Sequence, residues 1–264
     1  MAGARFDRVR LNRRDLRKPF PTGFARRLRG QHVRALARRG KYLLGELSSG
    51  DTLVMHLGMS GWFRVEKTEP AAARRRNRDR DLDNRHDHVV FTMSSGITVT
   101  FNDPRRFGIM DLVAADRLAG HASLGRLGPE PLSRAFDVSA LAERLAKRRI
   151  SLKIALLDQH VVAGIGNIYA SEALHQAGLS PFRLASSLVT AVGVPRAGCT
   201  RLARAIKSVL RRAIAQKDPE RYRASRFRVY ECEGEPCPTV GCSGTIARVW
   251  QRGRSTFYCP VCQR

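Results

Sequence analysis

The sequence predicts an α+β protein with an N-terminal antiparallel β-sandwich, a helical region after it, and a cysteine-rich hairpin at the C-terminus. Short apolar runs bounded by Gly, Ser, Asp and Asn fill residues 34–113. Apolar residues at helical spacing begin at Val138, and five of the six cysteines lie within residues 232–262. Runs of the first kind are typical of strands, and apolar residues repeated every three or four positions are typical of helices.

Strand-like runs dominate residues 1–115. Three of them are Tyr42-Leu43-Leu44, Leu53-Val54-Met55 and Val89-Val90-Phe91. Their spacing and the turn residues between them predict an antiparallel sandwich or barrel. Residues 74–85 are mostly charged, so we expect a solvated loop between strands. Residues 116–134 are rich in Gly and Pro and predict a linker.

Residues 135–225 are predicted to form a helical domain. The apolar spacing places four helices at 138–147, 154–159, 167–177 and 201–215. We expect Asn167 to be the N-cap and Gly178 the C-cap of the third helix, because these residue types favour helix ends. The turn Gly164-Ile165-Gly166-Asn167 would join two helices into a helix-turn-helix-like element.

The charge of the chain narrows its function class. Its 264 residues hold 48 Lys and Arg against 23 Asp and Glu, a formal net charge of +25. Such an excess favours a polyanionic partner, most often nucleic acid, with ribosomal or membrane-surface binding as rivals. The sequence has no apolar run of membrane-spanning length and does not open like a signal peptide. We therefore expect a soluble, cytoplasmic protein, and a monomer.

The cysteines predict one structural zinc ion. Cys237 and Cys242 are separated by four residues, Cys259 and Cys262 by two, and the pairs by sixteen. Clustered cysteines in a reducing compartment favour a metal over disulfides, and four thiolates on two turns can close a tetrahedral Zn²⁺ site. Residues 226–264 would then be a small hairpin held by the metal. Cys232 is expected to be a bystander that could compete as a ligand.

Seven short motifs, in the same order, resemble the formamidopyrimidine-DNA glycosylase family, and within it the Fpg branch rather than the Nei branch. They are Arg39-Gly40-Lys41-Tyr42-Leu43-Leu44, His56-Leu57-Gly58-Met59-Ser60-Gly61, His86-Asp87-His88-Val89, Asp103-Pro104-Arg105-Arg106-Phe107-Gly108, Leu127-Gly128-Pro129-Glu130-Pro131-Leu132, the run Gly164 to Glu172, and the zinc hairpin ending Thr256-Phe257-Tyr258-Cys259. The resemblance implies a β-sandwich, a helix-two-turn-helix domain and a zinc finger. It also implies a partner, double-stranded DNA with a damaged base or an abasic site, and action at the bacterial nucleoid.

The resemblance implies a set of DNA-contacting residues. An enzyme of this kind must extrude a damaged base and fill the gap in the stack. Met59, Arg105 and Phe107 match the family's gap-filling residues, since Met and Phe can wedge between bases and Arg can hydrogen-bond the widowed partner. The other matched DNA contacts are His86, Arg148, Lys153 and Asn167. Asn167 would lie at a helix start, where backbone N–H groups bind phosphate, and Glu172 is expected near the lesion.

The resemblance also implies the chemistry. In the family a proline at the mature N-terminus attacks C1′ of the sugar, a glutamate beside it acts as general acid and base, and β- and δ-elimination cut the strand. Lys41 matches a proton donor to the leaving base, and Arg254 matches a zinc-finger arginine implicated in the second elimination. The implied activity is removal of oxidised purines (8-oxoguanine and formamidopyrimidines) with cleavage at abasic sites.

This chain departs from the family pattern at two places. It begins Met1-Ala2-Gly3 and has no Pro-Glu opening, which leaves three readings: a longer native chain, a catalytically inactive protein that binds DNA or lesions, or another amine, best Lys41, as nucleophile. The like charges of Arg38 and Arg39 close to Lys41 would help activate the Lys41 amine. Residues 216–227 replace a Gly-Gly-Thr-Thr loop, which puts the lesion preference in doubt. A zinc-ribbon factor would fit the charge and cysteines but not the other motifs.

Overall fold

A computed structural model describes residues 1–68, 84–216 and 227–264. Contacts divide the chain into two compact units, Met1–Gly125 and Arg126–Arg264. The finer division predicted from the sequence (1–115, 116–134, 135–225 and 226–264) stays a prediction. Most of the predicted charged loop, and the segment that replaces the Gly-Gly-Thr-Thr loop apart from its ends, lie outside the described residues.

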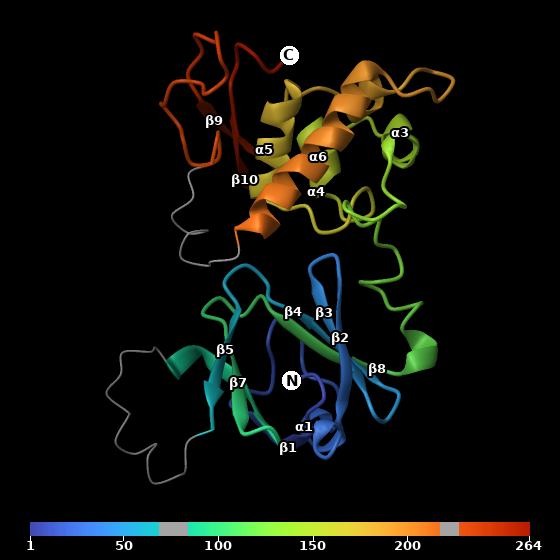
Figure 1. The fold of residues 1–264 in the computed structure, drawn as a ribbon, viewed down its shortest axis with the longest axis vertical. Helices are drawn as coiled ribbons and strands as arrows, with labels where there is room; N and C mark the ends of the chain where they lie inside the picture. The colour runs from blue at the N-terminus through green and yellow to red at the C-terminus, as the bar shows by residue number, and fades with distance from the viewer. Residues whose placement is uncertain (69–83, 217–226) are drawn as a thin grey trace. The chain divides into compact units, whose positions relative to one another are not determined.

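The first unit is an antiparallel β-sandwich, as predicted. One sheet has the strand order β1-β6-β7-β5 and the other the order β2-β3-β4-β8 (Figure 1). The strands are β1 (Phe6–Leu11), β2 (Val33–Arg39), β3 (Tyr42–Leu47), β4 (Thr52–His56), β5 (Trp62–Lys67), β6 (Asp87–Met93), β7 (Ile97–Asn102) and β8 (Ile109–Val113). The described residues of this unit also form the short helices α1 (Phe24–Leu28), η1 (Asn84–His86) and η2 (Ala115–Arg117).

Both sheets contribute to one apolar core. Phe6, Phe91 and Phe101 come from one sheet, and Leu53 and Met55 from the other; all are at most 2% exposed. The strand β1 was not expected, because three of its six residues are charged. It forms because it pairs with the buried strand β6 and places Phe6 in the core.

The described part of the second unit (residues 126–216 and 227–264) has four α-helices around a separate core. They are α3 (Val138–Ala146), α4 (Leu152–Leu157), α5 (Asn167–Ala177) and α6 (Ala197–Ala215), with a 3₁₀ turn η3 (Ala185–Leu188). The predicted bounds differ mainly at two starts, since α4 begins at Leu152 and α6 at Ala197. Helix α5 lies between α6 and the terminal hairpin, and contacts both (Figure 1).

The caps of α5 agree with the prediction at one end only. Gly178, with φ 64°, is the left-handed C-cap. At the start, Gly166 is the N-cap and Asn167 is the first helical residue, so the predicted N-cap was wrong by one position. The reason is that the Asn167 side chain donates to Ser255 O (2.9 Å) instead of capping the helix.

The hairpin at the C-terminus consists of β9 (Ala247–Gln251) and β10 (Arg254–Tyr258). Its two turn residues, Arg252 and Gly253, both have positive φ (46° and 73°). Two such residues form the turn whose twist matches antiparallel strands. No helix among the described residues has the length and apolar character needed to cross a membrane.

Candidate functional site

In the first unit, the buried carboxylate of Asp103 joins two loops. One loop follows β4 and contains Met59; the other follows β7 and contains Arg105 and Phe107. Asp103 is 0% exposed and accepts hydrogen bonds from Ser60 Oγ (2.6 Å) and from the Gly108 N–H (2.7 Å). The Arg105 N–H in turn donates to Ser60 Oγ (3.2 Å). A single carboxylate thus fixes one loop to the other; the pair is called the Asp103 junction below.

Backbone contact adds to the Asp103 junction at Gly58. Gly58 has φ 72°, and a Cβ added there would lie 2.5 Å from the carbonyl carbon of Phe107. A side chain therefore cannot be accommodated without separating the two loops. Only glycine combines this left-handed backbone with so close an approach.

The side chains on the Asp103 junction point outward. Met59 is 72% exposed and Phe107 is 39% exposed. The guanidinium carbon of Arg105 lies 4.8 Å from the centre of the Phe107 ring, a cation–π contact. Exposed Met and Phe side chains contribute little to the core, so their position favours a role in binding over a role in folding.

Two histidines contact the backbone of Asp103. His88 is 2% exposed, and its Nε2 lies 2.8 Å from the carbonyl oxygen of Asp103, to which it donates. His86, half-buried, accepts the Asp103 N–H at its own carbonyl oxygen (3.0 Å). His86 is therefore joined to the Asp103 junction through its backbone, and its contact with DNA stays a prediction.

Lys41 occupies the turn between β2 and β3 and is exposed. His56, paired with Tyr42 across the sheet, accepts the Gly58 N–H at Nδ1 (2.9 Å). Burial, and then the charges of Lys41 and Arg17, lower the pKa of His56. Lys41 thus lies close enough to His56 to disfavour its protonation, and His56 links this turn to the loop that contains Met59.

In the second unit, Lys153 and Asn167 converge on one carbonyl group. Lys153 Nζ donates to Ser255 O (2.7 Å) and to Thr256 Oγ1 (2.7 Å), and Asn167 Nδ2 donates to the same Ser255 O (2.9 Å). Lys153 is 0% exposed, whereas Arg254 next to Ser255 is exposed. These contacts fix the hairpin residue Arg254 beside the start of α5. Contact of Lys153 and Asn167 with phosphate stays a prediction.

The burial of Lys153 predicts a specific pH dependence. Burial, and then the charge of Arg254, lower the pKa of Lys153 from 10.5 to about 8. Between these two values the unfolded chain binds more protons than the folded chain, so this group makes folding more favourable as pH rises. The stability of the protein relative to Lys153→Met should therefore grow by about 2 kcal/mol from pH 7.5 to 10, less than the full shift because water screens part of the charge. Urea unfolding at both pH values measures it; a difference that shrinks with pH would contradict it.

Glu172, on α5, holds the backbone of residues 228–230, and its expected place near the lesion stays a prediction. Its buried carboxylate accepts three backbone N–H groups, from Arg228 (3.1 Å), Val229 (2.9 Å) and Tyr230 (3.1 Å). It therefore fixes residues 228–230, at the start of the zinc finger (described residues 227–264), to α5. Arg148 forms an ion pair with Asp158 (2.6 Å) at the end of α4, and its role in DNA contact stays a prediction.

Four cysteine sulfurs form the zinc site. Cys237, Cys242, Cys259 and Cys262 have their sulfurs within 4.8 Å of one another, with 3.7 Å between Cys237 and Cys262 and 3.6 Å between Cys242 and Cys259. Zinc–sulfur bonds of about 2.3 Å in a tetrahedron require sulfurs about 3.8 Å apart. The geometry therefore fits one structural Zn²⁺ with no open position. Cys232 is not in this group, and its thiol donates to Phe227 O (3.3 Å).

Gly244 makes room for the zinc site. A Cβ added there would lie 2.6 Å from the sulfur of Cys259 and 2.9 Å from Val261 Cβ. Glycine at this position lets the backbone pass directly beside a ligand sulfur.

Comparison with known proteins covers nearly the whole chain. Models of the formamidopyrimidine-DNA glycosylase N-terminal domain, the formamidopyrimidine-DNA glycosylase H2TH domain, and the zinc finger found in FPG and IleRS match residues 1–110, 127–222 and 234–264. The formamidopyrimidine-DNA glycosylases of Azorhizobium caulinodans and Rhodopseudomonas palustris are 50% and 52% identical to this chain. Each match covers 100% of this chain and 94% of the relative. The chain belongs to the formamidopyrimidine-DNA glycosylase family.

Solved structures agree with this family. A Lactococcus lactis formamidopyrimidine-DNA glycosylase, non-covalently bound to DNA containing an AP site, superposes with a TM-score of 0.84 at 27% identity, over 100% of this chain and 94% of that one. The MutM (Fpg) protein of Thermus thermophilus superposes with a TM-score of 0.79 at 34% identity, over 100% and 92%. The family, the fold and the zinc site expected from the sequence motifs are confirmed.

Sequence reasoning missed the residues that hold the site together. Asp103 lies in one of the family motifs, but the burial of its carboxylate was not predicted. Ser60 is a similar case, and for Glu172 the hydrogen bonds from residues 228–230 were not predicted. The available signal for Asp103 was its position at the end of a buried strand, immediately before a turn.

Proposed function

We propose that this protein excises oxidised purines, 8-oxoguanine and formamidopyrimidines, from double-stranded DNA and cleaves the strand at the resulting abasic site by β- and δ-elimination. The proposal rests on one observation above all. The Asp103 junction holds the exposed side chains of Met59, Arg105 and Phe107 on two loops fixed to each other. Apolar wedges beside an arginine are what a protein needs to fill the space left by an extruded base.

The remaining residues take roles that suit their positions. Lys41, exposed on its turn, is proposed to protonate the leaving base. Arg254, exposed beside the start of α5, is proposed to bind the phosphate during the second elimination, with backbone N–H groups at the start of that helix. His86, Arg148, Lys153 and Asn167 are proposed to contribute to DNA binding. The DNA in the Lactococcus lactis complex supports DNA as the partner.

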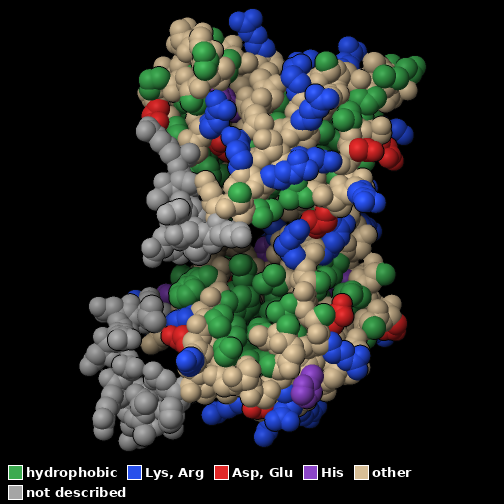
Figure 2. Space-filling model, in the orientation of Figure 1, with side chains coloured by type: hydrophobic (Ala, Val, Ile, Leu, Met, Phe, Trp, Pro, Cys, Tyr) green, Lys and Arg blue, Asp and Glu red, His purple; other side chains and the backbone are tan. Residues whose placement is uncertain are grey.

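Charge supports the same partner. Lys and Arg clearly outnumber Asp and Glu on the face of each unit seen in Figure 2, in keeping with the net charge of +25. Phosphate contacts release counterions from DNA, so affinity should fall steeply as salt rises.

Base release tests the proposal directly. Duplexes that differ only in one base, 8-oxoguanine, thymine glycol or guanine, are incubated with excess protein, and the freed base is quantified by mass spectrometry. We expect release of 8-oxoguanine, slower release of the oxidised pyrimidine, and none of guanine. Salt-dependent binding without release of any base would instead support the alternative, a catalytically inactive lesion-binding protein.

Truncation of the wedges should reduce excision without affecting stability. Met59→Ala and Phe107→Ala are expected to lower single-turnover excision at least about tenfold, because the gap in the stack stays unfilled at a cost of about 1–3 kcal/mol. Thermal unfolding should change little, since both side chains are exposed. Val65→Ala, at a 63% exposed apolar residue of β5, is the matched control. Equal excision by all three variants would remove the wedge assignment.

A further inference from the structure

One residue beside the zinc site, His175, has no role in any of the features described above. His175 lies on the last turn of α5 and is only 4% exposed. Its Nε2 is 3.5 Å from the sulfur of Cys237 and 3.2 Å from Thr239 Oγ1. A buried imidazole within reach of a metal ligand is either incidental packing or a hydrogen-bond donor to that ligand, and the surrounding atoms distinguish the two.

The partners of Nε2 require it to carry the proton. A cysteine that binds zinc is a thiolate and can only accept a hydrogen bond. The geometry therefore needs Nε2–H, directed at the sulfur of Cys237 and shared with the oxygen of Thr239. On the other side of the ring, Nδ1 is buried and has no hydrogen-bond partner in the described structure. A bare ring nitrogen there costs less than a buried, unpaired N–H, which favours the tautomer with its proton on Nε2.

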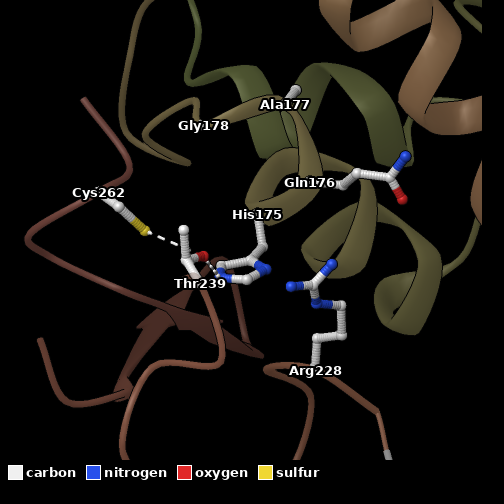
Figure 3. Close-up of a pocket in the computed structure, with 7 residues that line it drawn as sticks. All are labelled: His175, Gln176, Ala177, Gly178, Arg228, Thr239 and Cys262. Atoms are coloured by element: carbon white, nitrogen blue, oxygen red, sulfur yellow. Dashed lines mark hydrogen bonds between the residues drawn. The ribbon is translucent and has the colours of Figure 1, made fainter. Parts of the chain in front are cut away.

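Thr239 extends the arrangement to a second sulfur. Its Oγ1 lies 3.8 Å from the sulfur of Cys262 (Figure 3). Since a zinc-bound thiolate only accepts, the hydroxyl is free to donate to Cys262 while its oxygen receives the His175 proton. One histidine and one threonine thus direct polar hydrogens at the two ligands whose sulfurs lie 3.7 Å apart.

The same side of the zinc site borders a cavity. His175, Thr239 and Cys262 line a cavity of about 300 Å³ together with Gln176, Ala177, Gly178 and Arg228 (Figure 3). Cys262 is half-buried, so water and small chelators have a route to its sulfur. A donor on this side would both spread the negative charge of the thiolates and obstruct attack on the metal.

We propose that His175 is a positioning residue for the zinc site, donating Nε2–H to the thiolate of Cys237 and so connecting the metal to helix α5. The contacts of α5 explain why this matters. Asn167 contacts Ser255, Glu172 holds residues 228–230, and His175 reaches Cys237, all from one side of the helix. Loss of the metal would then disturb the contacts of α5 from His175, in its last turn, to Asn167, its first residue.

Zinc release provides the first test. The zinc-loaded chain is mixed with excess 4-(2-pyridylazo)resorcinol, and the rate of metal transfer is recorded. His175→Phe keeps a ring but no donor, and is expected to release zinc about 10- to 100-fold faster. His175→Gln places an amide N–H near the Nε2 position and should restore a rate within a fewfold of the original. His160→Phe, at an exposed histidine of the same unit, should leave the rate unchanged.

A spectroscopic signature separates the hydrogen bond from packing, and it uses the unmutated chain. With ¹¹³Cd in place of zinc, a proton hydrogen-bonded to a ligand sulfur shows scalar coupling to the metal. We expect coupling between ¹¹³Cd and the His175 Nε2 proton. Absence of that coupling, or equal release rates for His175→Phe and His175→Gln, would overturn the proposal.

Discussion

Removal of zinc is expected to unfold residues 227–264 and to abolish DNA binding. The buried cluster of this segment is Val229, Cys232, Cys237, Ile246, Phe257 and Cys259, and half of these are cysteines. So small a core cannot offset the chain entropy of the finger without the metal, whose binding contributes about 10–16 kcal/mol in small zinc domains. Chelation followed by loss of dispersed amide resonances from this segment measures the effect.

Loss of the finger should also weaken the helices. The Lys153 amine and the Glu172 carboxylate are both buried, and the hydrogen bonds described above for both lead to the finger. When the finger unfolds, two buried charged groups lose these partners, so the melting temperature of the helical unit should fall as well. Cys259→Ser should reproduce the effect of chelation, whereas Cys232→Ser should keep one zinc per chain. A finger that stays folded without metal would contradict this account.

Asp103→Ala is expected to separate the two loops of the Asp103 junction. It removes the acceptor for Ser60 Oγ and for the Gly108 N–H in a fully buried position. We expect a loss of about 3 kcal/mol in the free energy of unfolding and at least a 100-fold loss of excision, because Met59 and Phe107 are then no longer held together. Denaturant unfolding and single-turnover base release measure the two effects.

A conservative variant and a surface control sharpen this prediction. Asp103→Asn can offer its amide oxygen to Gly108 and its amide N–H to Ser60, whose hydroxyl can also accept, so it should keep most of the activity. Asp7→Ala removes an exposed ion pair with Arg5 and should cost less than about 1 kcal/mol. The account fails if Asp103→Ala excises the lesion as well as Asp7→Ala.

Features encoded within a short stretch could be predicted from the sequence. The cysteine spacing predicts the zinc ligands because two short turns supply them in pairs. Alternating and continuous apolar runs predict the strands because each run also lies within one short stretch of sequence. Met59 and Phe107 were assigned from the family resemblance alone, since an apolar residue in a loop carries no local sign of exposure.

Features that depend on distant partners could not be predicted. Lys153 is buried because its hydrogen-bond acceptors, Ser255 and Thr256, lie more than 100 positions later in the chain. Asp103 is buried because Ser60, 43 positions earlier, returns to it from the other loop. A lysine and an aspartate are mostly exposed in proteins, so only the tertiary fold reveals that these two are internal.

Borohydride trapping tests the central claim most directly. The zinc-loaded chain is incubated with a duplex containing 8-oxoguanine or an abasic site, and borohydride is added to reduce any iminium that joins an amine of the protein to C1′ of the sugar. We predict a covalent protein–DNA adduct. On the abasic duplex, which has no base to protonate, its loss in Lys41→Ala would place the amine at Lys41, whereas its persistence would place the amine elsewhere in the chain. No adduct, with salt-dependent binding retained, would contradict a covalent lyase.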